Sequence, residues 1–413
     1  MTSLKAWVPT KLKYFGTFKG GAGFPHEEQG VEEGEIPFFT VKDLSFKGNS
    51  IEISDNYVSR STAKSLGAFV FPRNTIVFAK VGAALLLQRF KFLARPSCID
   101  NNMMGLVVDE SKAVPSFLKY FFEHLDFSEI VNPGAVPSLN EEQISGIALL
   151  MPSVERQRRI AAELDHRIGL LDALVSEKQK LLTLLTEKRS KLVVRAVTNG
   201  LNHEIPLDES GIPWLGKIPR HWKVERAKWL FDERDVRSES GEEVLLSVSH
   251  LTGVTTRAEK NVNMFMAESL EGYKRCEAGD LVINTLWAWM GAMGVARQPG
   301  IVSPAYNVYQ PDPTLDPDYV DLLVRTPRFA EEITRYSKGV WSSRMRLYPE
   351  GLYEAWLPVP PKDEQQAITA HIQAETKKID DFAKATERTI ALLKERRSVL
   401  ISAAVTGNLV FDK

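Results

Sequence analysis

An internal repeat constrains this sequence more than any other feature. The segment "LVVRAVTNGL" at 192–201 returns 208 residues later as "LISAAVTGNL" at 400–409. The wider segments 149–201 and 357–409 align without a gap, and sixteen of their 53 aligned pairs are identical. The identical pairs include Pro152 with Pro360, Gln157 with Gln365, Asp172 with Asp380 and Arg189 with Arg397. A repeat of this length predicts that the chain is a duplication of one structural unit.

Both copies are predicted to be long helices. Each follows proline and has acidic residues in its first turn, Glu155 in one copy and Asp363 with Glu364 in the other, where they suit the positive end of a helix dipole. Each ends in a Gly/Asn pair, two residue types that tolerate the left-handed conformation that ends a helix.

Apolar residues within each copy are spaced alternately by three and four, the period of a left-handed coiled coil, although the same stripe also serves ordinary core packing. The predicted spacer seam consists of Leu164, Ile168, Leu171, Val175, Leu182, Leu185, Leu192, Ile372, Ile379, Ile390, Leu393 and Leu400.

The segments between the helices also repeat, but faintly. "WVPTKLKYF" at 7–15 is similar to "WKVERAKWL" at 222–230, "NTIVFAK" at 74–80 to "GDLVINT" at 279–285, and "PSFLKYFF" at 115–122 to "PDYVDLLV" at 317–324. Between these three anchors the sequences diverge. One scaffold therefore carries two different surfaces.

The resulting order is globule, helix, globule, helix. It predicts an α+β fold in which two mixed α/β domains are separated by two long antiparallel helices that form a coiled-coil spacer. The expected boundaries are 1–150 for the first domain, 151–200 for the first spacer helix, 201–358 for the second domain and 359–413 for the second spacer helix.

The composition of the chain and the motifs that it lacks exclude several classes of protein. No run approaches eighteen apolar residues, and the N-terminus has no secretory signal, so a cytoplasmic protein is expected. The two cysteines, Cys98 and Cys276, lie too far apart for a metal-ligand motif. "GIPWLGKI" at 211–218 lacks the Ser/Thr of a phosphate-binding loop. We therefore predict no catalytic residues, no metal site and no cofactor in this chain.

The net charge of −1 hides local basic regions. Residues 60–99 and 334–349 contain no Asp or Glu but several Lys and Arg residues. Such regions are typical of surfaces that bind nucleic acid.

In combination, "LPVPPKDEQQAI" at 357–368, "LLKERRSVLISAAVTGNL" at 392–409, their copies at 149–160 and 184–201, and "DESGIPWLGKIPRHWKV" at 208–224 resemble the specificity subunit of a type I restriction–modification system. The resemblance covers nearly the whole chain. It implies two target recognition domains, each reading one half of a split, asymmetric double-stranded DNA sequence. It also implies a non-catalytic subunit on which two methyltransferase subunits and, in the full complex, restriction subunits assemble. S-adenosylmethionine, ATP and Mg²⁺ would then be bound by those partners.

With this resemblance in view, we expect cations and polar side chains of the basic regions to contact DNA. The candidate DNA-binding residues are Lys19, Lys42, Lys80, Arg89, Lys91 and Arg95 in the first globule and Thr252, Arg257, Asn284, Lys338, Arg344 and Arg346 in the second. Trp287, Trp289 and Trp341 are further candidates for contact with DNA, although buried packing is the more common fate of tryptophan. A stand-alone DNA-binding regulator and a coiled-coil protein scaffold are the alternative interpretations.

Overall fold

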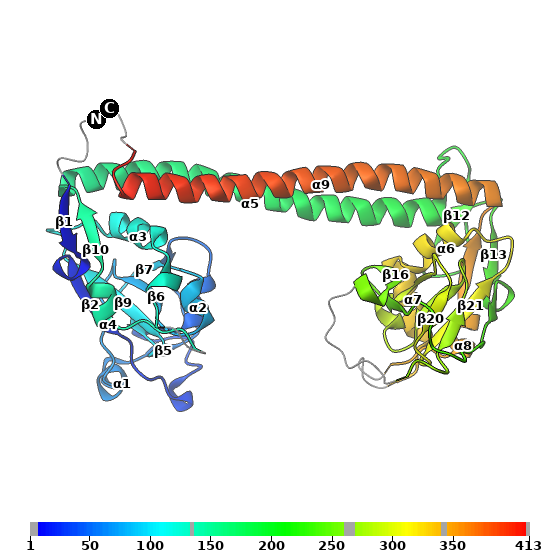
Figure 1. The fold of residues 1–413 in the computed structure, drawn as a ribbon, viewed down its shortest axis with the longest axis horizontal. Helices are drawn as coiled ribbons and strands as arrows, with labels where there is room; N and C mark the ends of the chain where they lie inside the picture. The colour runs from blue at the N-terminus through cyan, green and yellow to red at the C-terminus, as the bar shows by residue number, and fades with distance from the viewer. Residues whose placement is uncertain (1–6, 133–135, 260–268, 340–344, 410–413) are drawn as a thin grey trace. The chain divides into compact units, whose positions relative to one another are not determined.

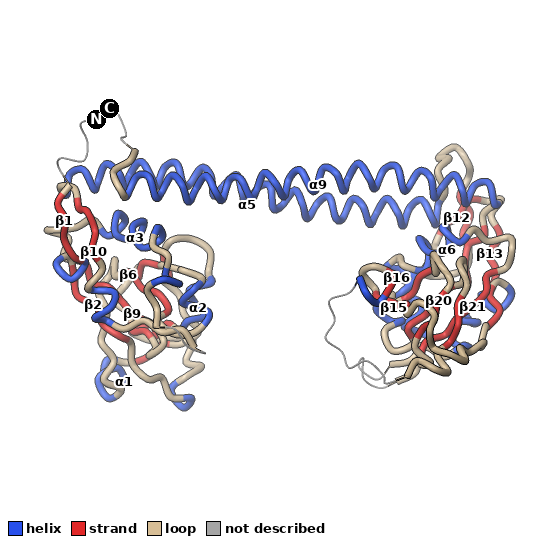
Figure 2. The backbone as a smooth tube through the Cα atoms, viewed as in Figure 1, coloured by secondary structure: helices blue, strands red, loops and turns tan. Residues whose placement is uncertain are grey.

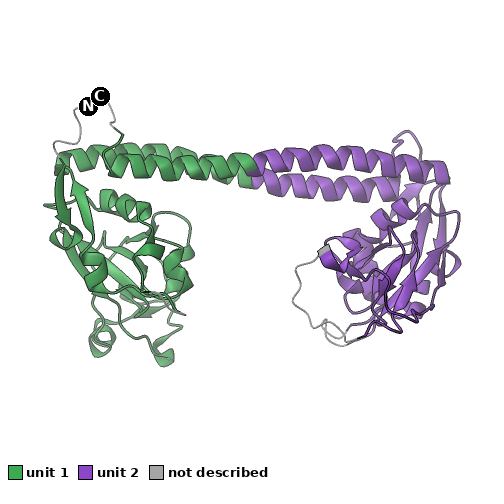
Figure 3. Cartoon of the chain, viewed as in Figure 1, with its two compact units in different colours: residues 1–179, 388–413 green, residues 180–387 purple. Residues whose placement is uncertain are grey.

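The computed structural model describes residues 7–132, 136–259, 269–339 and 345–409 (Figures 1 and 2). By compactness the chain divides into two units (Figure 3). Unit 1 contains residues 1–179 and 388–413, and unit 2 contains residues 180–387. Each unit therefore holds one globule together with half of each long helix.

Unit 1 is built around a five-stranded sheet with the order β2-β9-β6-β7-β4. A three-stranded sheet, β5-β3-β8, and a two-stranded sheet, β1-β10, complete it. Its strands are β1 (Val8–Lys11), β2 (Gly16–Gly20), β3 (Ile36–Phe39), β4 (Ser50–Ile51), β5 (Tyr57–Val58), β6 (Ile76–Ala79), β7 (Lys91–Leu93), β8 (Cys98–Ile99), β9 (Met103–Val108) and β10 (Ala148–Met151). Its short helices are η2 (Leu12–Tyr14), η3 (His26–Glu28), η4 (Val41–Ser45), α1 (Arg60–Ser65), α2 (Ala83–Leu86), α3 (Pro115–His124), η5 (Phe127–Glu129) and α4 (Glu141–Ser145).

Unit 2 is built around a four-stranded sheet with the order β14-β21-β18-β19. Two-stranded sheets pair β13 with β22, β15 with β16, β17 with β20 and β11 with β12. Its strands are β11 (Leu207–Glu209), β12 (Lys217–Pro219), β13 (Lys223–Arg226), β14 (Phe231–Glu233), β15 (Leu246–Ser249), β16 (Gly253–Thr256), β17 (Lys274–Cys276), β18 (Leu281–Asn284), β19 (Met293–Val295), β20 (Gly300–Val302), β21 (Tyr306–Pro311) and β22 (Trp356–Val359). Its short helices are η6 (Ala227–Trp229), η7 (Arg257–Glu259), η8 (Ala288–Met290), α6 (Pro317–Val324), α7 (Pro327–Tyr336) and α8 (Pro349–Glu354).

The two units repeat one topology. The antiparallel run β2-β9-β6-β7 corresponds to β14-β21-β18-β19, and the pair β1-β10 corresponds to β13-β22. All three pairs of similar segments fall on matching elements. The first pair covers β1 and η2 in unit 1 and β13 and η6 in unit 2. The second pair falls on β6 and β18, and the third on α3 and α6. Both α3 and α6 begin with proline, whose fixed backbone angle suits the first helical turn. The faint repeat predicted between the globules is therefore confirmed as a repeat of structure.

The two long helices are α5 (Val154–Asn199) and α9 (Lys362–Val405). Each is followed by glycine in the left-handed region, Gly200 with φ +72° and Gly407 with φ +78°. Only glycine adopts this conformation without steric cost, which explains the Gly/Asn endings of both copies.

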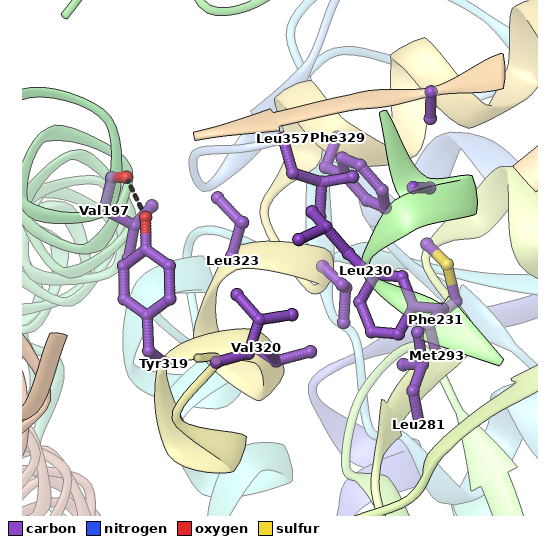
Figure 4. Close-up of a cluster of buried hydrophobic side chains, with 14 of the residues drawn as sticks. Val197, Leu230, Phe231, Leu281, Met293, Tyr319, Val320, Leu323, Phe329 and Leu357 are labelled. Carbon is purple, nitrogen blue, oxygen red and sulfur yellow. Dashed lines mark hydrogen bonds between the residues drawn. The ribbon is translucent and has the colours of Figure 1, made fainter. Parts of the chain in front are cut away.

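Each globule packs its core onto the final turns of one long helix and the first turns of the other. In unit 2, Ala196 and Val197 of α5 and Ile368 of α9 lie in the same apolar cluster as the sheet residues. Figure 4 shows the buried Tyr319 hydroxyl donating a hydrogen bond to the Val197 carbonyl at 2.9 Å. In unit 1, Leu164 and Ala404 occupy the corresponding cluster. The shared "AVT" phrase is thus core packing.

An ion pair joins α5 to α9 in each unit. Nε of Arg189 lies 3.2 Å from Oδ1 of Asp380 in unit 2, and Nε of Arg397 lies 3.2 Å from Oδ1 of Asp172 in unit 1. These are the same contact in the two copies of the repeat, because Asp172 matches Asp380 and Arg189 matches Arg397. The predicted α+β fold, with two β-rich domains and two long helices packed together, is confirmed.

Candidate nucleic-acid interface

The turn that follows the central strand of each sheet is the place where the two units are built alike but present different side chains. In unit 1 this turn is α2, which begins after Gly82 (φ +77°). The carbonyl of Lys80 accepts the N–H of Leu139 at 2.9 Å, which holds the base of the turn. Leu86 and Leu87 are exposed at its tip, and the exposed Arg89 follows.

In unit 2 the same turn is η8. The carbonyl of Thr285, which matches Lys80, accepts the N–H of Leu347 at 3.0 Å. Trp287 is 50% exposed and stacks on Trp289, with ring centroids 6.3 Å apart. Trp289 is half-buried and Trp341 lies outside the described residues, so buried packing does not hold for Trp287. The turn carries apolar side chains in both units, but these are two leucines in unit 1 and two tryptophans in unit 2.

Two of the predicted cations of unit 1 have hydrogen-bond partners within the unit, although the Lys42 side chain remains exposed. Nζ of Lys42 lies 2.7 Å from Oδ2 of Asp55, and this hydrogen bond raises the pKa of Lys42. The ammonium of Lys91 donates to the carbonyls of Phe46, at 2.8 Å, and Gly48. Burial lowers the pKa of Lys91. These contacts fix loops beside the sheet.

Of the other predicted cations of unit 1, Lys19, Arg89 and Arg95 are exposed and Lys80 is half-buried. The Lys19 ammonium stands 3.9 Å above the Phe69 ring centroid. Nη2 of the exposed Arg95 donates to the Glu35 carbonyl at 3.0 Å. Lys80 is half-buried at the end of β6. In the sequence, Lys80 precedes the α2 turn and Arg89 follows it.

Among the predicted residues of unit 2, Asn284 serves the fold. It is 7% exposed, donates through Nδ2 to the Tyr306 hydroxyl at 3.1 Å, and accepts the Leu286 N–H at 3.2 Å. Thr252 is exposed in the turn between β15 and β16, where its Oγ1 lies 3.0 Å from Oγ of Ser249.

The remaining predictions in unit 2 lie at or near η8. Lys338 and Arg346 are both exposed and pair through reciprocal backbone hydrogen bonds of 2.9 Å. Because Leu347 binds Thr285, this pair lies next to the strand end from which η8 starts. Arg257 is half-buried at the start of η7, and Arg344 lies outside the described residues.

The predicted spacer residues all lie on the packed sides of α5 and α9. Leu164, Ile168, Ile372, Ile379 and Ile390 are buried. The others, Leu171, Val175, Leu182, Leu185, Leu192, Leu393 and Leu400, are half-buried. Their place in the fold is compatible with a seam.

The family model of the type I restriction modification DNA specificity domain matches residues 5–184. The MjaIX specificity subunit of Methanocaldococcus jannaschii is 23% identical over 65% of this chain and 63% of that protein. The EcoBI specificity subunit of Escherichia coli is 20% identical over 98% of this chain and 86% of that protein. Among solved structures, a chain of a type I restriction–modification system has the same fold, with a TM-score of 0.69 and 15% identity over 99% of this chain and 100% of that one. The HsdS subunit of Thermoanaerobacter tengcongensis also shares it, with a TM-score of 0.54 and 15% identity over 98% and 97%.

Residues 5–184 therefore match a type I restriction modification DNA specificity domain, and the whole chain is similar to specificity subunits of such systems. The match spans 63% of the archaeal relative and 86% of the bacterial one. Within the described ranges, no group of three or more His, Cys, Asp and Glu side chains is placed to hold a metal ion. Among the described residues, no helix is long and apolar enough to cross a membrane.

The two cysteines of this chain are unreactive because of where they lie in the fold. Cys98 and Cys276 are buried, and burial raises the pKa of their thiols to about 11 and about 12 respectively. A thiol with so high a pKa is a poor nucleophile and a poor metal ligand at neutral pH.

Sequence reasoning missed the joints between the globules and the long helices. Gln157, 1% exposed, accepts the Val114 N–H at 2.8 Å and donates to the Pro152 carbonyl at 2.9 Å. Gln365, fully buried, accepts the Asp316 N–H at 2.7 Å and donates to the Pro360 carbonyl at 2.9 Å. The identity of this glutamine in both copies was the available signal.

Proposed function

We propose that this chain reads a bipartite, asymmetric double-stranded DNA target for a type I restriction–modification complex, with one half-site bound by each unit. The observation that carries this proposal is the η8 and α2 turn: one scaffold, repeated element by element, presents Trp287 in one unit and Leu86 with Leu87 in the other. Two equal scaffolds with unequal surfaces suit a target whose halves differ in sequence.

Cations beside these turns supply the affinity that does not depend on sequence. Lys80 and Arg89 flank the turn of unit 1 in sequence, and the Lys338–Arg346 pair lies beside that of unit 2. These four cations would contact phosphates if each turn entered a groove. Contacts to phosphates fix position and orientation, whereas contacts to base edges and thymine methyl groups distinguish sequences. Lys19, Arg95, Thr252, Arg257 and Arg344 extend the same proposed surface. Lys42, Lys91 and Asn284 act by holding its loops.

The subunit contributes specificity and leaves the chemistry to its partners. Two methyltransferase subunits with S-adenosylmethionine would methylate adenine in each half-site, and restriction subunits would use ATP and Mg²⁺ to cleave unmodified DNA. The complex would act in the cytoplasm. Segments 1–150 and 201–358 are the proposed target recognition domains.

The long helices, within 151–200 and 359–413, are the proposed spacer between half-sites. A helix rises 1.5 Å per residue, so the 46 residues of α5 span roughly 69 Å. Stiff packed helices of this length would hold the gap in the target at a fixed number of base pairs.

The decisive experiment co-expresses the chain with its cognate methyltransferase subunit and maps methylated adenines in the host genome by single-molecule sequencing. The expected result is a split motif with a fixed gap that disappears when the chain is omitted. An intact, soluble complex that methylates no such motif would contradict the proposal. High-affinity, sequence-specific binding by the chain alone would favour a stand-alone regulator instead.

A further inference from the structure

The two units share one exposed aromatic position although most of their surfaces differ. The single-turn helices η2 and η6, each following the first strand of its sheet pair, carry Lys13 with Tyr14 and Lys228 with Trp229. Tyr14 is 58% exposed and Trp229 66%, the highest values for aromatic side chains in the described part of each unit. In both turns the lysine ammonium lies near its neighbour's ring, 5.2 Å from the Tyr14 centroid and 4.7 Å from that of Trp229.

The backbone of both turns is held in the same way. Leu12 and Ala227, which begin the turns, are completely buried. The N–H of Leu12 donates to the Ile147 carbonyl at 3.1 Å, and that of Ala227 donates to the Ala355 carbonyl at 2.8 Å. A ring presented by a fixed backbone loses little conformational entropy when a partner covers it.

The surroundings of the two rings provide further apolar area. In unit 1, Val8 of β1 and Leu150 of β10 are exposed on the strands that adjoin η2. In unit 2, Trp229 lines a hollow of about 690 Å³ together with Pro313 and Pro360. Tryptophan and tyrosine in such settings are the residue types that dominate binding energy at protein–protein interfaces.

The repeat identifies the kind of partner. Surfaces that read two different DNA half-sites must diverge, as the turns α2 and η8 do. A surface feature retained at matching positions in both units instead suits a protein of which two copies bind. We propose that Tyr14 and Trp229 each anchor one copy of the methyltransferase subunit, which would offer an apolar groove with a carboxylate for the neighbouring lysine. This inference rests on the proposed function and assigns it two docking residues.

The test counts methyltransferase subunits. The chain is co-purified with the methyltransferase as wild type and as Tyr14→Ala, Trp229→Ala and the double variant, and each complex is analysed by native mass spectrometry during dilution. Each single variant should lose one copy of the methyltransferase, with the affinity for that copy falling at least ~10-fold, and the double variant should lose both.

Matched controls separate docking from folding. Ile53→Ala in unit 1 and Val244→Ala in unit 2 remove exposed apolar side chains elsewhere and should leave two copies bound. Tyr14→Phe and Trp229→Phe retain an aromatic ring and should restore most of the affinity.

Three results would overturn the inference. The double variant could hold both copies with wild-type affinity. It could hold both copies but lose DNA binding, which would assign these rings to the DNA. The wild-type complex could contain a single copy. Failure of the proposed function is distinguishable, because the wild-type complex would then methylate no split motif whatever the variants do.

Discussion

Gln365 and Gln366 are adjacent on α9 and have the same side chain, but they differ in burial and in hydrogen bonding. Gln365 is buried and has hydrogen bonds to the Asp316 N–H and to the carbonyls of Thr314 and Pro360, whereas Gln366 is exposed. The buried amide of Gln365 is hydrogen-bonded to the segment before α6 and to the segment before α9. Its loss would leave buried backbone groups without a hydrogen-bond partner. The pair therefore offers an internal comparison of burial at constant residue type.

We predict that Gln365→Leu lowers the free energy of unfolding of unit 2 by about 2 kcal/mol, because it leaves the Asp316 N–H and the Pro360 carbonyl without their partner. Gln366→Leu should change it by less than about 0.5 kcal/mol. Urea unfolding followed by circular dichroism measures both. Equal effects of the two substitutions would show that the hydrogen bonds of Gln365 do not secure the joint.

A second residue-scale prediction concerns the thiols. With pKa values raised to about 11 and about 12, Cys98 and Cys276 should be thiolates in only about one molecule in a thousand or fewer at pH 8. Iodoacetamide should therefore leave both unlabelled in the folded chain and label both in urea, as mass spectrometry would detect. Labelling of the native chain at the rate of a free cysteine would place the thiols at the surface.

At the scale of elements, the end of α9 forms an ion pair with α3 in unit 1, whereas the matching end of α5 has no equivalent pair with α6 among the ion pairs described for unit 2. Arg397 binds Glu123 of α3, at 2.9 Å, and Asp172 of α5, while Glu123 also binds the buried Lys119. Burial opposes the charge of Arg397, but Glu123 and Asp172 more than offset it, so its pKa is raised. In unit 2 the residue matching Glu123 is Arg325, which binds Asp321 within α6.

We predict that Arg397→Ala destabilises unit 1 by about 2 kcal/mol, since it leaves the largely buried Glu123 carboxylate with one partner fewer. The matched variant Arg189→Ala removes only the half-exposed pair with Asp380 and should cost less than about 1 kcal/mol. Amide hydrogen exchange in α3 measures the stability of unit 1, and exchange in α6 measures that of unit 2. The prediction would be wrong if Arg189→Ala accelerated exchange in α6 more than Arg397→Ala accelerated exchange in α3.

Local sequence patterns were sufficient for the elements but not for their partners. The acids in the first turn of α9 and the glycine after each long helix are local signals, and they predict these helices from the sequence. Proline at the start of α3 and α6 is a signal of the same local kind. The fates of Lys91 and Asn284 depend on carbonyls and hydroxyls more than twenty residues away, which no local pattern contains. For the same reason the order of strands in each sheet could not be predicted.

At the scale of the whole molecule, the repeat gives a test of the proposed spacer. Removing 177–183 and 385–391, which match in the repeat, shortens both helices by one heptad, or about 10 Å, and preserves the apolar period. The gap in the methylated motif should shrink by about three base pairs. Replacing the same residues with an alanine-rich heptad keeps the length and should keep the gap. A deletion variant that methylates the original motif would disprove the role as a spacer.

The joints made by Gln157 and Gln365 also bear on how such a chain can change over evolutionary time. Each glutamine accepts a main-chain amide at the start of α3 or α6, so the joint places no demand on which side chains the globule carries there. These main-chain hydrogen bonds can therefore persist while the sequence of a globule changes, provided that its apolar contacts with the long helices are kept. Under the proposed function, a globule with a different surface could then be joined to the same pair of helices at these two glutamines.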